Sequence, residues 1–504
     1  MNKWLKYGLL GFILFNLVLC AWSVLHNNIY YYTDIGRDFL IFNEIAIKKL
    51  VLFGPRADMQ GLFHGILWHY LNVPAYMLGN GNPVSVGWFW MLLTGGFIGS
   101  VYYSIKKLFD QESGLLATAL VSASVVQITQ GFFHGNGAML IMPLFFYTFI
   151  RYVQIRQLRT LIIHLITVGM LVQFEIAVGV PLAMLSCLAL AYVILRDRRW
   201  KHVIGFFALI PFAATFLLIE LKYNFLQFRS LASYSQGARD GGAHTPFVLS
   251  LIDRIRNIGT HGVNIVQDPL HAANIILFSL LLGAIYISFK NADKRRAIYM
   301  SFLYFNFGYY ILTLLHGGYL IKFWWLPMSI LPIMMIATIQ KYFVKPVYIA
   351  LLIIFMSIAT FQNVQFITLS DTQRATDFHS WQFHYTLAQQ ALQKAPQEFG
   401  YFIYAPDIYG YQDKYAFLYA NRQLNKKGVA FEKRLITYVF SEPPPKDFTG
   451  HDIDWWVSEK LQIKTKPLET RTLLKGYEVR SYLLSESDLK TPSQITPSDW
   501  LFYR

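Results

Sequence analysis

The stretch Tyr31-Tyr32-Thr33-Asp34-Ile35-Gly36-Arg37-Asp38 follows an apolar run, Leu5 to Leu25, that is long enough to cross a bilayer as a helix. A long polar and aromatic segment comes after it and is not apolar enough to cross. A carboxylate and a guanidinium three residues apart cost free energy where a membrane helix emerges, unless water solvates them or they serve a function. Asp34 is therefore our first candidate for a functional residue.

The composition indicates a membrane protein. The chain has 504 residues, of which 55% are hydrophobic and only 14% charged, whereas soluble domains carry about 25% charged residues. Apolar runs recur up to about residue 365, and after Asp371 the composition becomes that of a soluble domain. We expect a multi-spanning membrane domain over residues 1–365 and a soluble C-terminal domain over residues 366–504.

The formal net charge of +15 lies mainly in short loops between the apolar runs. Basic residues in short loops keep those loops in the cytoplasm, so this charge predicts topology and argues against nucleic-acid binding. The basic clusters are Lys106-Lys107, Arg151 to Arg159, Arg196 to Lys201, Lys290 to Arg296, and Lys341 with Lys345.

The apolar runs predict about eleven membrane crossings. They lie near residues 5–26, 84–105, 114–132, 137–152, 159–174, 176–195, 202–221, 271–289, 297–315, 322–340 and 345–362. With the N-terminus inside, every basic cluster then falls on the cytoplasmic side. An odd number of crossings puts the C-terminal domain outside, in the periplasm or extracellular space beyond a cytoplasmic (inner) membrane.

Two of the expected outer loops, 27–83 and 222–270, are much longer than a turn requires. The first contains an amphipathic helix pattern over 39–50, typical of a helix lying in the membrane interface. It also contains a short aromatic run over 65–78, which favours a re-entrant or interfacial segment over a crossing. The second includes a glycine-rich stretch, 237–244, that we expect to be mobile.

The C-terminal domain has a helix pattern over 384–394 and strand patterns over 401–404, 434–440 and 477–484, which predict a small α/β or α+β module. Cys20 and Cys187 both lie inside apolar runs, so the cysteines indicate no disulfide framework.

The predicted topology gathers many ionisable and polar side chains on the outer face. They are Asp34, Arg37, Asp38, Arg56, Asp58, His64, His134, Asn136, Glu175, Glu220, Lys222, His316 and Lys322. A carboxylate can act as a general base toward a hydroxyl or amine, and arginine or lysine suits a phosphate. Together with the lipid-accessible aromatic loop, these carboxylates and basic side chains indicate an enzyme that transfers a group from a lipid phosphate donor. The chain contains no nucleotide-binding glycine motif.

The order of these motifs resembles the GT-C superfamily of integral-membrane glycosyltransferases, in the branch of protein O-mannosyltransferases and lipid A aminoarabinose transferases. The resemblance covers about 360 residues. It is carried by Asp34-Ile-Gly-Arg37-Asp38, Gly54-Pro-Arg-Ala-Asp-Met-Gln-Gly-Leu-Phe-His-Gly65, Trp68-His-Tyr-Leu, Gly79-Asn-Gly-Asn-Pro83, Phe133-His-Gly-Asn136, Ile219-Glu-Leu-Lys222-Tyr-Asn-Phe225 and Lys322-Phe-Trp-Trp-Leu-Pro327.

The resemblance implies a polyprenyl-phosphate-linked sugar donor and an inverting displacement at the outer face, by a hexosyl- or pentosyltransferase acting on a lipid, glycan or protein acceptor. By motif position Asp34 is the expected catalytic base, and Arg37 is expected to steady Asp34 or to bind the donor phosphate. Arg56 and Lys322 are the other expected donor-phosphate ligands. The chain departs from the family at Ile35, where a glutamate is common, and at His134-Gly-Asn136, where a second acidic residue often stands.

The expected substrate-binding residues are His64, His134, Asn136, Glu175, Glu220 and Lys222. His64, His134 and Glu175 are of types that ligate zinc or manganese, but their spacing is no metal signature, so the sequence assigns no metal ligand and leaves a divalent ion open. Two other functions stay open: a transporter or flippase for a lipid-linked sugar, and a non-catalytic membrane scaffold for the outer domain.

Overall fold

The computed structural model describes residues 3–48, 50–57, 61–235, 246–265, 271–316, 318–406, 409–445 and 448–495. The chain forms two compact units. The helical unit comprises Met1–Trp22, Val51–Leu71 and Trp88–Thr368, and the sheet unit comprises Ser23–Leu50, Asn72–Gly87 and Leu369–Arg504. Asp34 therefore belongs to the same compact unit as the C-terminal residues, although a membrane helix precedes it.

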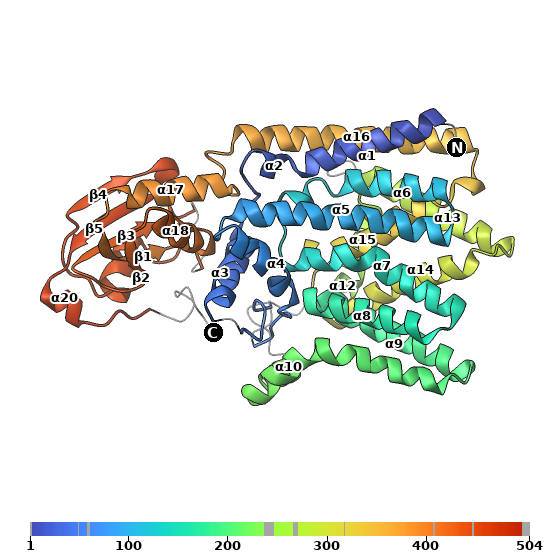
Figure 1. Ribbon diagram of the computed structural model, residues 1–504, viewed down its shortest axis with the longest axis horizontal. Helices are drawn as coiled ribbons and strands as arrows, with labels where there is room; N and C mark the ends of the chain where they lie inside the picture. Colours follow the sequence, from blue (N-terminus) through green and yellow to red (C-terminus); the bar gives the residue numbers. More distant parts are fainter. Residues whose placement is uncertain are drawn as a thin grey trace. The chain divides into compact units, whose positions relative to one another are not determined.

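Each of the predicted crossings contains a helix (Figure 1). These helices are α1 (Lys3–Cys20), α5 (Pro83–Leu108), α6 (Gln111–Ser124), α7 (His134–Ile155), α8 (Leu158–Phe174), α9 (Ile176–Arg196), η2 (Trp200–Leu209) continuing into α10 (Ile210–Lys222), α13 (His271–Lys290), α14 (Arg296–Thr313), α15 (Lys322–Ile336) and α16 (Lys345–Thr372). Short helices α2 (Trp22–Leu25), η1 (Ile128–Gln130), η3 (Leu314–His316) and η4 (Gln340–Tyr342) follow four of them.

Among the described residues, eight helices are long and apolar enough to cross a membrane. Two of the predicted crossings, α8 and α15, are apolar but shorter than 18 residues. The predicted crossing near 114–132 forms α6, which has only 14 residues and ends at Ser124. The chain is a multi-pass membrane protein, and eleven crossings remain a prediction.

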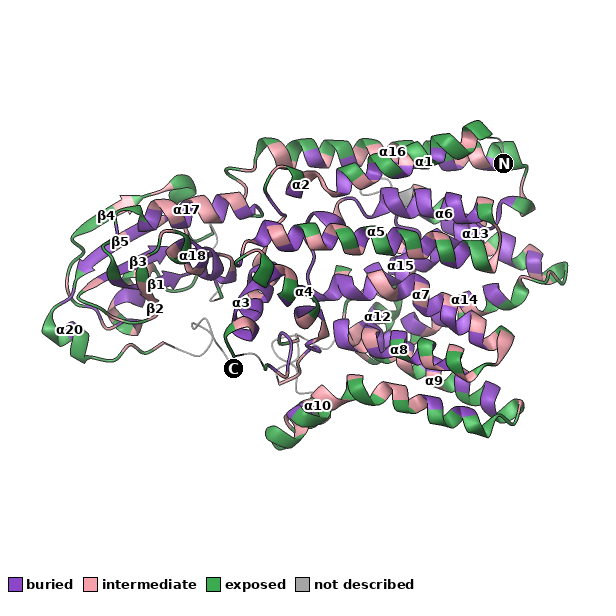
Figure 2. Ribbon diagram, viewed as in Figure 1, coloured by how far each residue is buried: buried purple, intermediate pink, exposed green. Residues whose placement is uncertain are grey.

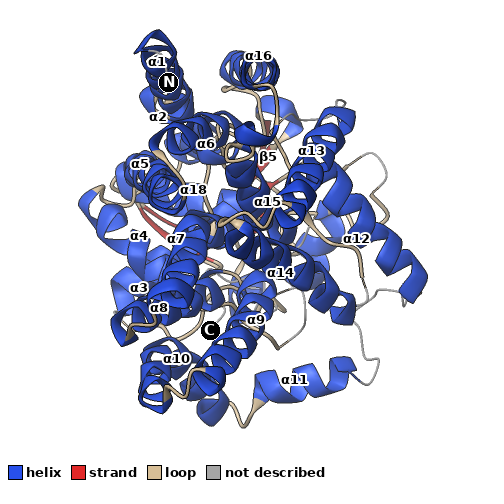
Figure 3. Cartoon of the chain, turned by 90° about the vertical axis from the view of Figure 1, so that its right-hand side faces the viewer, coloured by secondary structure: helices blue, strands red, loops and turns tan. Residues whose placement is uncertain are grey.

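The helices of this unit pack side by side, and the end view in Figure 3 shows them as a bundle. The outward faces carry apolar side chains. Along η2 and α10, Trp200, Phe207 and Leu217 are all more than half exposed, and Figure 2 shows mostly exposed (green) and intermediate (pink) residues along α10. Exposed apolar side chains of this kind are expected where a helix faces lipid rather than water.

Ion pairs link several of the basic loops at one end of this bundle. Arg156 pairs with Asp197 at 2.6 Å, Arg295 with Asp110 at 3.2 Å, and Lys345 with Glu112 at 2.8 Å. The first pair joins the loops near residues 156 and 197, and the other two pairs join the loops near residues 110, 295 and 345. Within each of these two groups, loops that we predict to lie on the same side of the membrane are in direct contact. This is the arrangement that the alternation of basic and non-basic loops predicts.

The first long loop contains two helices, α3 (Thr33–Lys48) and α4 (Leu67–Leu78). We predict the amphipathic helix over 39–50, but it begins six residues earlier, at Thr33, so that Asp34 lies in its first turn and Arg37 directly after that turn. Helix α4 has 12 residues, which agrees with a segment too short to cross. The second long loop contains α11 (Leu226–Ser235) and α12 (Phe247–His261). Its glycine-rich stretch and Asp58 lie outside the described residues.

The C-terminal residues form a mixed five-stranded sheet in the order β2-β1-β3-β5-β4, which confirms the α/β module. The strands are β1 (Glu398–Tyr404), β2 (Lys427–Ala430), β3 (Ile436–Ser441), β4 (Glu469–Thr472) and β5 (Glu478–Leu483). The helices are α17 (Trp381–Gln393), α18 (Tyr411–Gln423), α19 (Ile453–Trp455), η5 (Trp456–Lys460), η6 (Leu474–Gly476) and α20 (Glu486–Lys490).

Strand β1 lies between β2 and β3 and is parallel to both, whereas β5 is antiparallel to β3 and β4. Successive side chains of β1 face opposite sides of the sheet, as the strand period requires. Tyr401 packs against Phe417 of α18, with ring centroids 5.9 Å apart, while Phe402 packs against Trp456 at 6.5 Å. The sheet is therefore covered on both faces.

Candidate functional site

Asp34 and Arg37 form an ion pair at the start of α3. The Arg37 guanidinium lies 2.8 Å from Asp34 Oδ1 and 3.6 Å from Asp38 Oδ1. The side chain of Asp38 is 1% exposed, but that of Asp34 is 31% exposed. Of the two carboxylates, Asp34 is thus the one that a molecule from outside can reach. An acidic residue in a first helical turn is also stabilised by the helix dipole.

Contacts with the C-terminal part of the sheet unit hold this end of α3. Gln412, in α18, accepts hydrogen bonds from the Tyr31 hydroxyl at 3.2 Å and from Thr33 Oγ1 at 3.1 Å. Gly36 lies directly against the Gln412 backbone, because a Cβ at this position would come within 2.8 Å of the Gln412 nitrogen. The absence of a side chain at Gly36 thus allows the helix that carries Asp34 to dock.

A buried polar pair lies beneath this contact. His384 Nδ1 is 2.6 Å from Asp413 Oδ1, and His384 Nε2 is 2.8 Å from the carbonyl oxygen of Phe378. The Tyr31 ring packs edge-on against His384, with centroids 5.8 Å apart. This pair could not be predicted from the sequence, because it joins α17 to α18 and nothing in the spacing of the two residues marks it.

Burial raises the pKa of Tyr32 well above its usual value, and the charges of Asp34 and Asp38 raise it further. The Tyr32 phenol therefore stays neutral at physiological pH. A neutral phenol beside Asp34 can still donate a hydrogen bond, and it adds no negative charge to a region that already holds two carboxylates.

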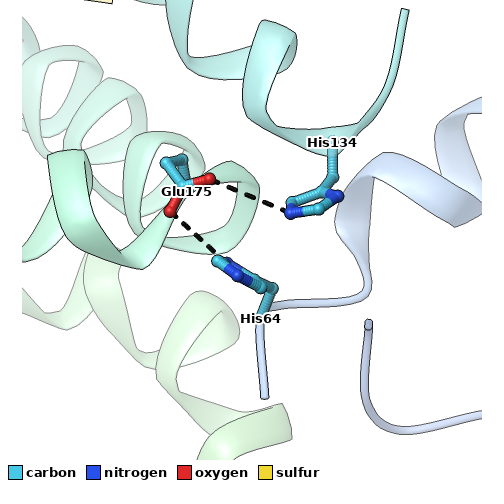
Figure 4. Close-up of side chains that lie close together, drawn as sticks. All are labelled: His64, His134 and Glu175. Carbon is cyan, nitrogen blue, oxygen red and sulfur yellow. Dashed lines mark ion pairs between the residues drawn. The ribbon is translucent and has the colours of Figure 1, made fainter. Parts of the chain in front are cut away.

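In the helical unit, His64, His134 and Glu175 come together. One ligand-type atom from each residue lies within 4.8 Å of the others, and all three residues are buried. His64 Nδ1 is 3.6 Å from Glu175 Oε1, and His134 Nε2 is 3.8 Å from Glu175 Oε2. Figure 4 shows the carboxylate between the two imidazole rings, with one oxygen directed toward each. Residues that are 70 and 41 positions apart in sequence thus form one cluster.

The local backbone explains why these side chains converge. His134 is the first residue of α7, and Glu175 caps the start of α9 by accepting a hydrogen bond from the Ala177 amide at 3.2 Å. Asn136, a predicted substrate ligand, accepts a hydrogen bond from the Phe133 amide at 3.0 Å. The Asn136 side chain therefore stabilises the start of α7, a role that a cap residue at this position commonly has.

Helix α15 also begins beside this cluster. Phe323 packs edge-on against Phe133, with ring centroids 4.3 Å apart, so the first turns of α7 and α15 are in contact. Gly135 brings α7 close to Glu175 as well, because a Cβ on this glycine would lie 3.3 Å from Glu175 Oε2. Lys322 is the first residue of α15 and is exposed. Three helix N-termini, of α7, α9 and α15, thus point their positive ends toward one region.

A second buried cluster holds the segment that leads into α15. Arg254 of α12 pairs with Asp253 at 2.7 Å and donates hydrogen bonds to the carbonyl oxygens of Gly318 at 2.6 Å and Thr313 at 2.9 Å. The Asp253 carboxylate accepts a hydrogen bond from the Leu320 amide at 3.1 Å. The sequence analysis missed Arg254, although its polar neighbours recur at helical spacing in α12.

Three predicted ligands lie outside these clusters. Arg56 is exposed, and its backbone pairs with that of Phe63 in an isolated antiparallel β-bridge. Glu220 accepts a hydrogen bond from the Phe228 amide at 3.4 Å, and Lys222 lies over the Tyr223 ring at 5.1 Å. Glu220 and Lys222 thus contact different groups near the end of α10.

Comparison with known proteins identifies the fold. Residues 64–217 match the family model of dolichyl-phosphate-mannose-protein mannosyltransferase. A crystal structure of ArnT from Cupriavidus metallidurans bound to undecaprenyl phosphate matches with a TM-score of 0.61 and 10% identity, covering 94% of this chain and 97% of that chain. The apo state of the same protein matches with a TM-score of 0.58, the same identity and the same coverage.

The Archaeoglobus fulgidus oligosaccharyltransferase in its apo form matches with a TM-score of 0.48 and 14% identity, over 85% of this chain and 65% of that chain. None of the curated proteins matches the chain by sequence. The chain therefore has the GT-C fold and is similar to the mannosyltransferase and ArnT type of membrane glycosyltransferase, as its motifs predicted.

Proposed function

We propose that this chain is a glycosyltransferase that moves a sugar from a polyprenyl-phosphate donor to an acceptor at the outer face of a cytoplasmic membrane. The observation that carries the proposal is the partly exposed Asp34–Arg37 ion pair at the start of α3, in a chain with the GT-C fold. The ArnT structure of the same fold has undecaprenyl phosphate bound, which supports a donor of that class here.

In the proposed reaction, Asp34 takes the proton from the acceptor hydroxyl or amine as this group attacks the anomeric carbon of the sugar. The new bond forms on the face opposite the phosphate. The bond from the anomeric carbon to the phosphate oxygen breaks, and the electron pair leaves with the polyprenyl phosphate. Configuration at the anomeric carbon is therefore inverted.

The leaving phosphate gains negative charge, and cations and helix N-termini stabilise such charge. Lys322 and the first turns of α7, α9 and α15 supply these features in the helical unit, and we propose that they hold the donor phosphate. Arg37 has a different role in this mechanism: its guanidinium orients the Asp34 carboxylate. Arg56, Glu220 and Lys222 remain candidate contacts to lipid, sugar or acceptor.

The test uses a strain that lacks this chain. Mass spectrometry of its lipid A, cell-wall polymers and secreted glycoproteins should show one missing sugar mass, which identifies both the sugar and the acceptor class. The wild-type gene should restore this mass. Asp34→Asn should not, because removing a general base typically lowers the rate by about 10²–10⁴-fold.

Glu44→Gln is the matched control, because Glu44 lies on the same helix and forms its own ion pair with Lys48 at 2.7 Å. It should restore the sugar as the wild type does. Restoration by Asp34→Asn would refute the role of Asp34 as base. Accumulation of a lipid-linked sugar across sealed vesicles without a covalent product would instead indicate a transporter.

A further inference from the structure

The cluster of His64, His134 and Glu175 has the composition of a metal site. Two imidazoles and one carboxylate, drawn from three separate segments, surround a common point in the helical unit (Figure 4). The two rings are close together, with centroids 4.4 Å apart. Glu175 is 2% exposed and His134 4% exposed. Burying a carboxylate costs free energy unless a positive charge compensates it, and a divalent cation would do so.

The distances favour metal ligation over a direct histidine–glutamate hydrogen bond. The nitrogen–oxygen separations of 3.6 Å and 3.8 Å exceed those of a hydrogen bond, which is at most about 3.2 Å. Two ligands bound to one tetrahedral zinc ion at about 2.0–2.2 Å lie roughly 3.3–3.5 Å from each other. The two separations run to different oxygens of the Glu175 carboxylate, and the ligand-type atoms of the three residues lie within 4.8 Å of one another, so binding of one ion requires these side chains to close in by up to about 1.4 Å.

The backbone holds the three residues in place. The His64 amide donates to the Pro55 carbonyl oxygen at 2.9 Å, and its own carbonyl oxygen accepts from the Gly54 amide at 2.9 Å. Gly65 packs so closely on the next segment that a Cβ would lie 2.6 Å from the backbone oxygen of Gln173. Gln173 precedes Glu175 by two residues, so the segments that carry His64 and Glu175 are fixed against each other.

The ligand set also identifies the class of ion. Magnesium and calcium prefer oxygen ligands throughout, whereas imidazole nitrogen suits zinc and similar transition metals. Two histidines and one glutamate are the protein ligands of zinc in several hydrolases, where water or substrate occupies the fourth position.

We propose that His64, His134 and Glu175 bind one divalent transition-metal ion of the zinc class. Water occupies its remaining coordination position in the resting protein. That position is open to an oxygen of a phosphate group, an anion that the N-termini of α7, α9 and α15 favour. This second statement rests on the proposed function, whereas the binding of the ion does not.

The test measures metal binding to the full-length protein in detergent. After purification without chelator, mass spectrometry of the metal content should give about one zinc ion per chain, since one set of three protein ligands holds one ion. Cobalt exchanged into the site should give the visible absorption of a four-coordinate ion. Loss of His134 in His134→Ala should weaken zinc binding by at least about 100-fold, since even changes of outer-shell residues cost 10–100-fold.

His134→Cys replaces one zinc ligand by another and should retain the ion with a changed cobalt spectrum, which distinguishes loss of a ligand from loss of the fold. The matched control is His164→Gln, a buried histidine of α8 that contacts Thr148 and Ser186 instead; it should keep the zinc. Equal zinc content in wild type and His134→Ala, or no zinc and no cobalt spectrum in the wild type, would overturn the proposal. These readouts need no donor or acceptor, so they are independent of the transfer test.

Discussion

Gly65 illustrates how much can depend on one missing side chain. A Cβ there would meet the backbone of Gln173, so alanine requires the loop that carries His64 to move. We expect Gly65→Ala to destabilise the protein by about 1–3 kcal/mol and to lower zinc affinity by displacing His64. Thermal unfolding and zinc titration measure the two effects. Gly95→Ala is the control, because nothing lies within 4 Å of a Cβ on Gly95; an equal effect of both changes would contradict the expectation.

Asp488 gives a prediction for pH. Burial alone would raise the pKa of this carboxyl group, but hydrogen bonds from the Lys464 amide, Thr465 and Ser485 lower it to about 2. A carboxyl group whose pKa falls on folding stabilises the fold above its unfolded pKa of 3.8 and loses this contribution as pH falls toward 2.

Asp488→Asn should therefore destabilise the sheet around β5 by about 2 kcal/mol at pH 7. The difference from the wild type should shrink between pH 4 and pH 2. Hydrogen exchange of peptides from residues 460–490 measures this local stability. A difference that stayed constant over this pH range would show that the carboxylate charge is not the cause.

At the scale of single residues, Asp34 could be predicted because a carboxylate at the end of a membrane helix is unusual by itself. The cap role of Asn136 could not be predicted with the same ease. A cap depends on where a helix begins, and the sequence placed the start of α7 at residue 137 rather than at His134. This shift of three residues concealed the cap role, and the role of Asn136 as a substrate ligand stays a prediction.

Among the helices, α12 shows an inverted pattern of burial. Its polar residues Ser250, Arg254 and Asn257 are buried, while Phe247 and Ile255 are more than half exposed. This is the arrangement of a helix whose apolar face meets lipid. Replacing Arg254 by leucine would leave the Asp253 carboxylate and the carbonyl groups of the segment before α15 without their partner.

We expect Arg254→Leu to destabilise the helical unit by about 3–5 kcal/mol, the cost of breaking a buried ion pair by removal of one member. Thermal unfolding in detergent measures the loss, and faster proteolysis near residues 313–320 should accompany it. Ile255→Ala is the control on the exposed face of the same helix and should change the unfolding temperature little. An unchanged stability of Arg254→Leu would mean that the pair contributes nothing.

Helix positions were the most predictable feature of the chain, because long apolar runs have few alternatives in a membrane protein. The limits of α3 were less predictable. Its burial pattern depends on α18, which lies more than 350 residues later, and an isolated amphipathic pattern does not reveal such a partner. Because α18 is so distant in sequence, the amphipathic pattern over 39–50 predicts a helix whose apolar face lies in the membrane interface.

For the whole molecule, the alternation of basic loops predicts which side each segment faces. In a variant without Cys20 and Cys187, a cysteine at Glu486 should react with a membrane-impermeant maleimide in intact cells. Both this residue and Lys294 are exposed, but a cysteine at Lys294 should react only after the membrane is opened. Labelling of Lys294→Cys in intact cells, with protection of Glu486→Cys, would reverse the predicted topology.

His64, His134 and Glu175 could be recognised in the sequence as residues of metal-ligating types, but their proximity could not be predicted, for a reason that concerns the whole molecule. Metal motifs are recognisable when ligands share one helix or one loop. His64, His134 and Glu175 come from a loop and the starts of two helices, so only the packing of these segments brings them together. The sequence supplied the residue types, and the tertiary structure supplies the proximity.

The composition of the sheet unit has a consequence for the order of events during synthesis. Phe39 of α3 packs against Tyr415 of α18, with ring centroids 5.1 Å apart, and 415 − 39 = 376 residues separate them. At about 5–20 residues per second, the ribosome needs roughly 20–75 seconds to make the second after the first. Throughout that interval α3 lacks its contact with α18, so the helix that carries Asp34 reaches its final packing only after α18 has been made.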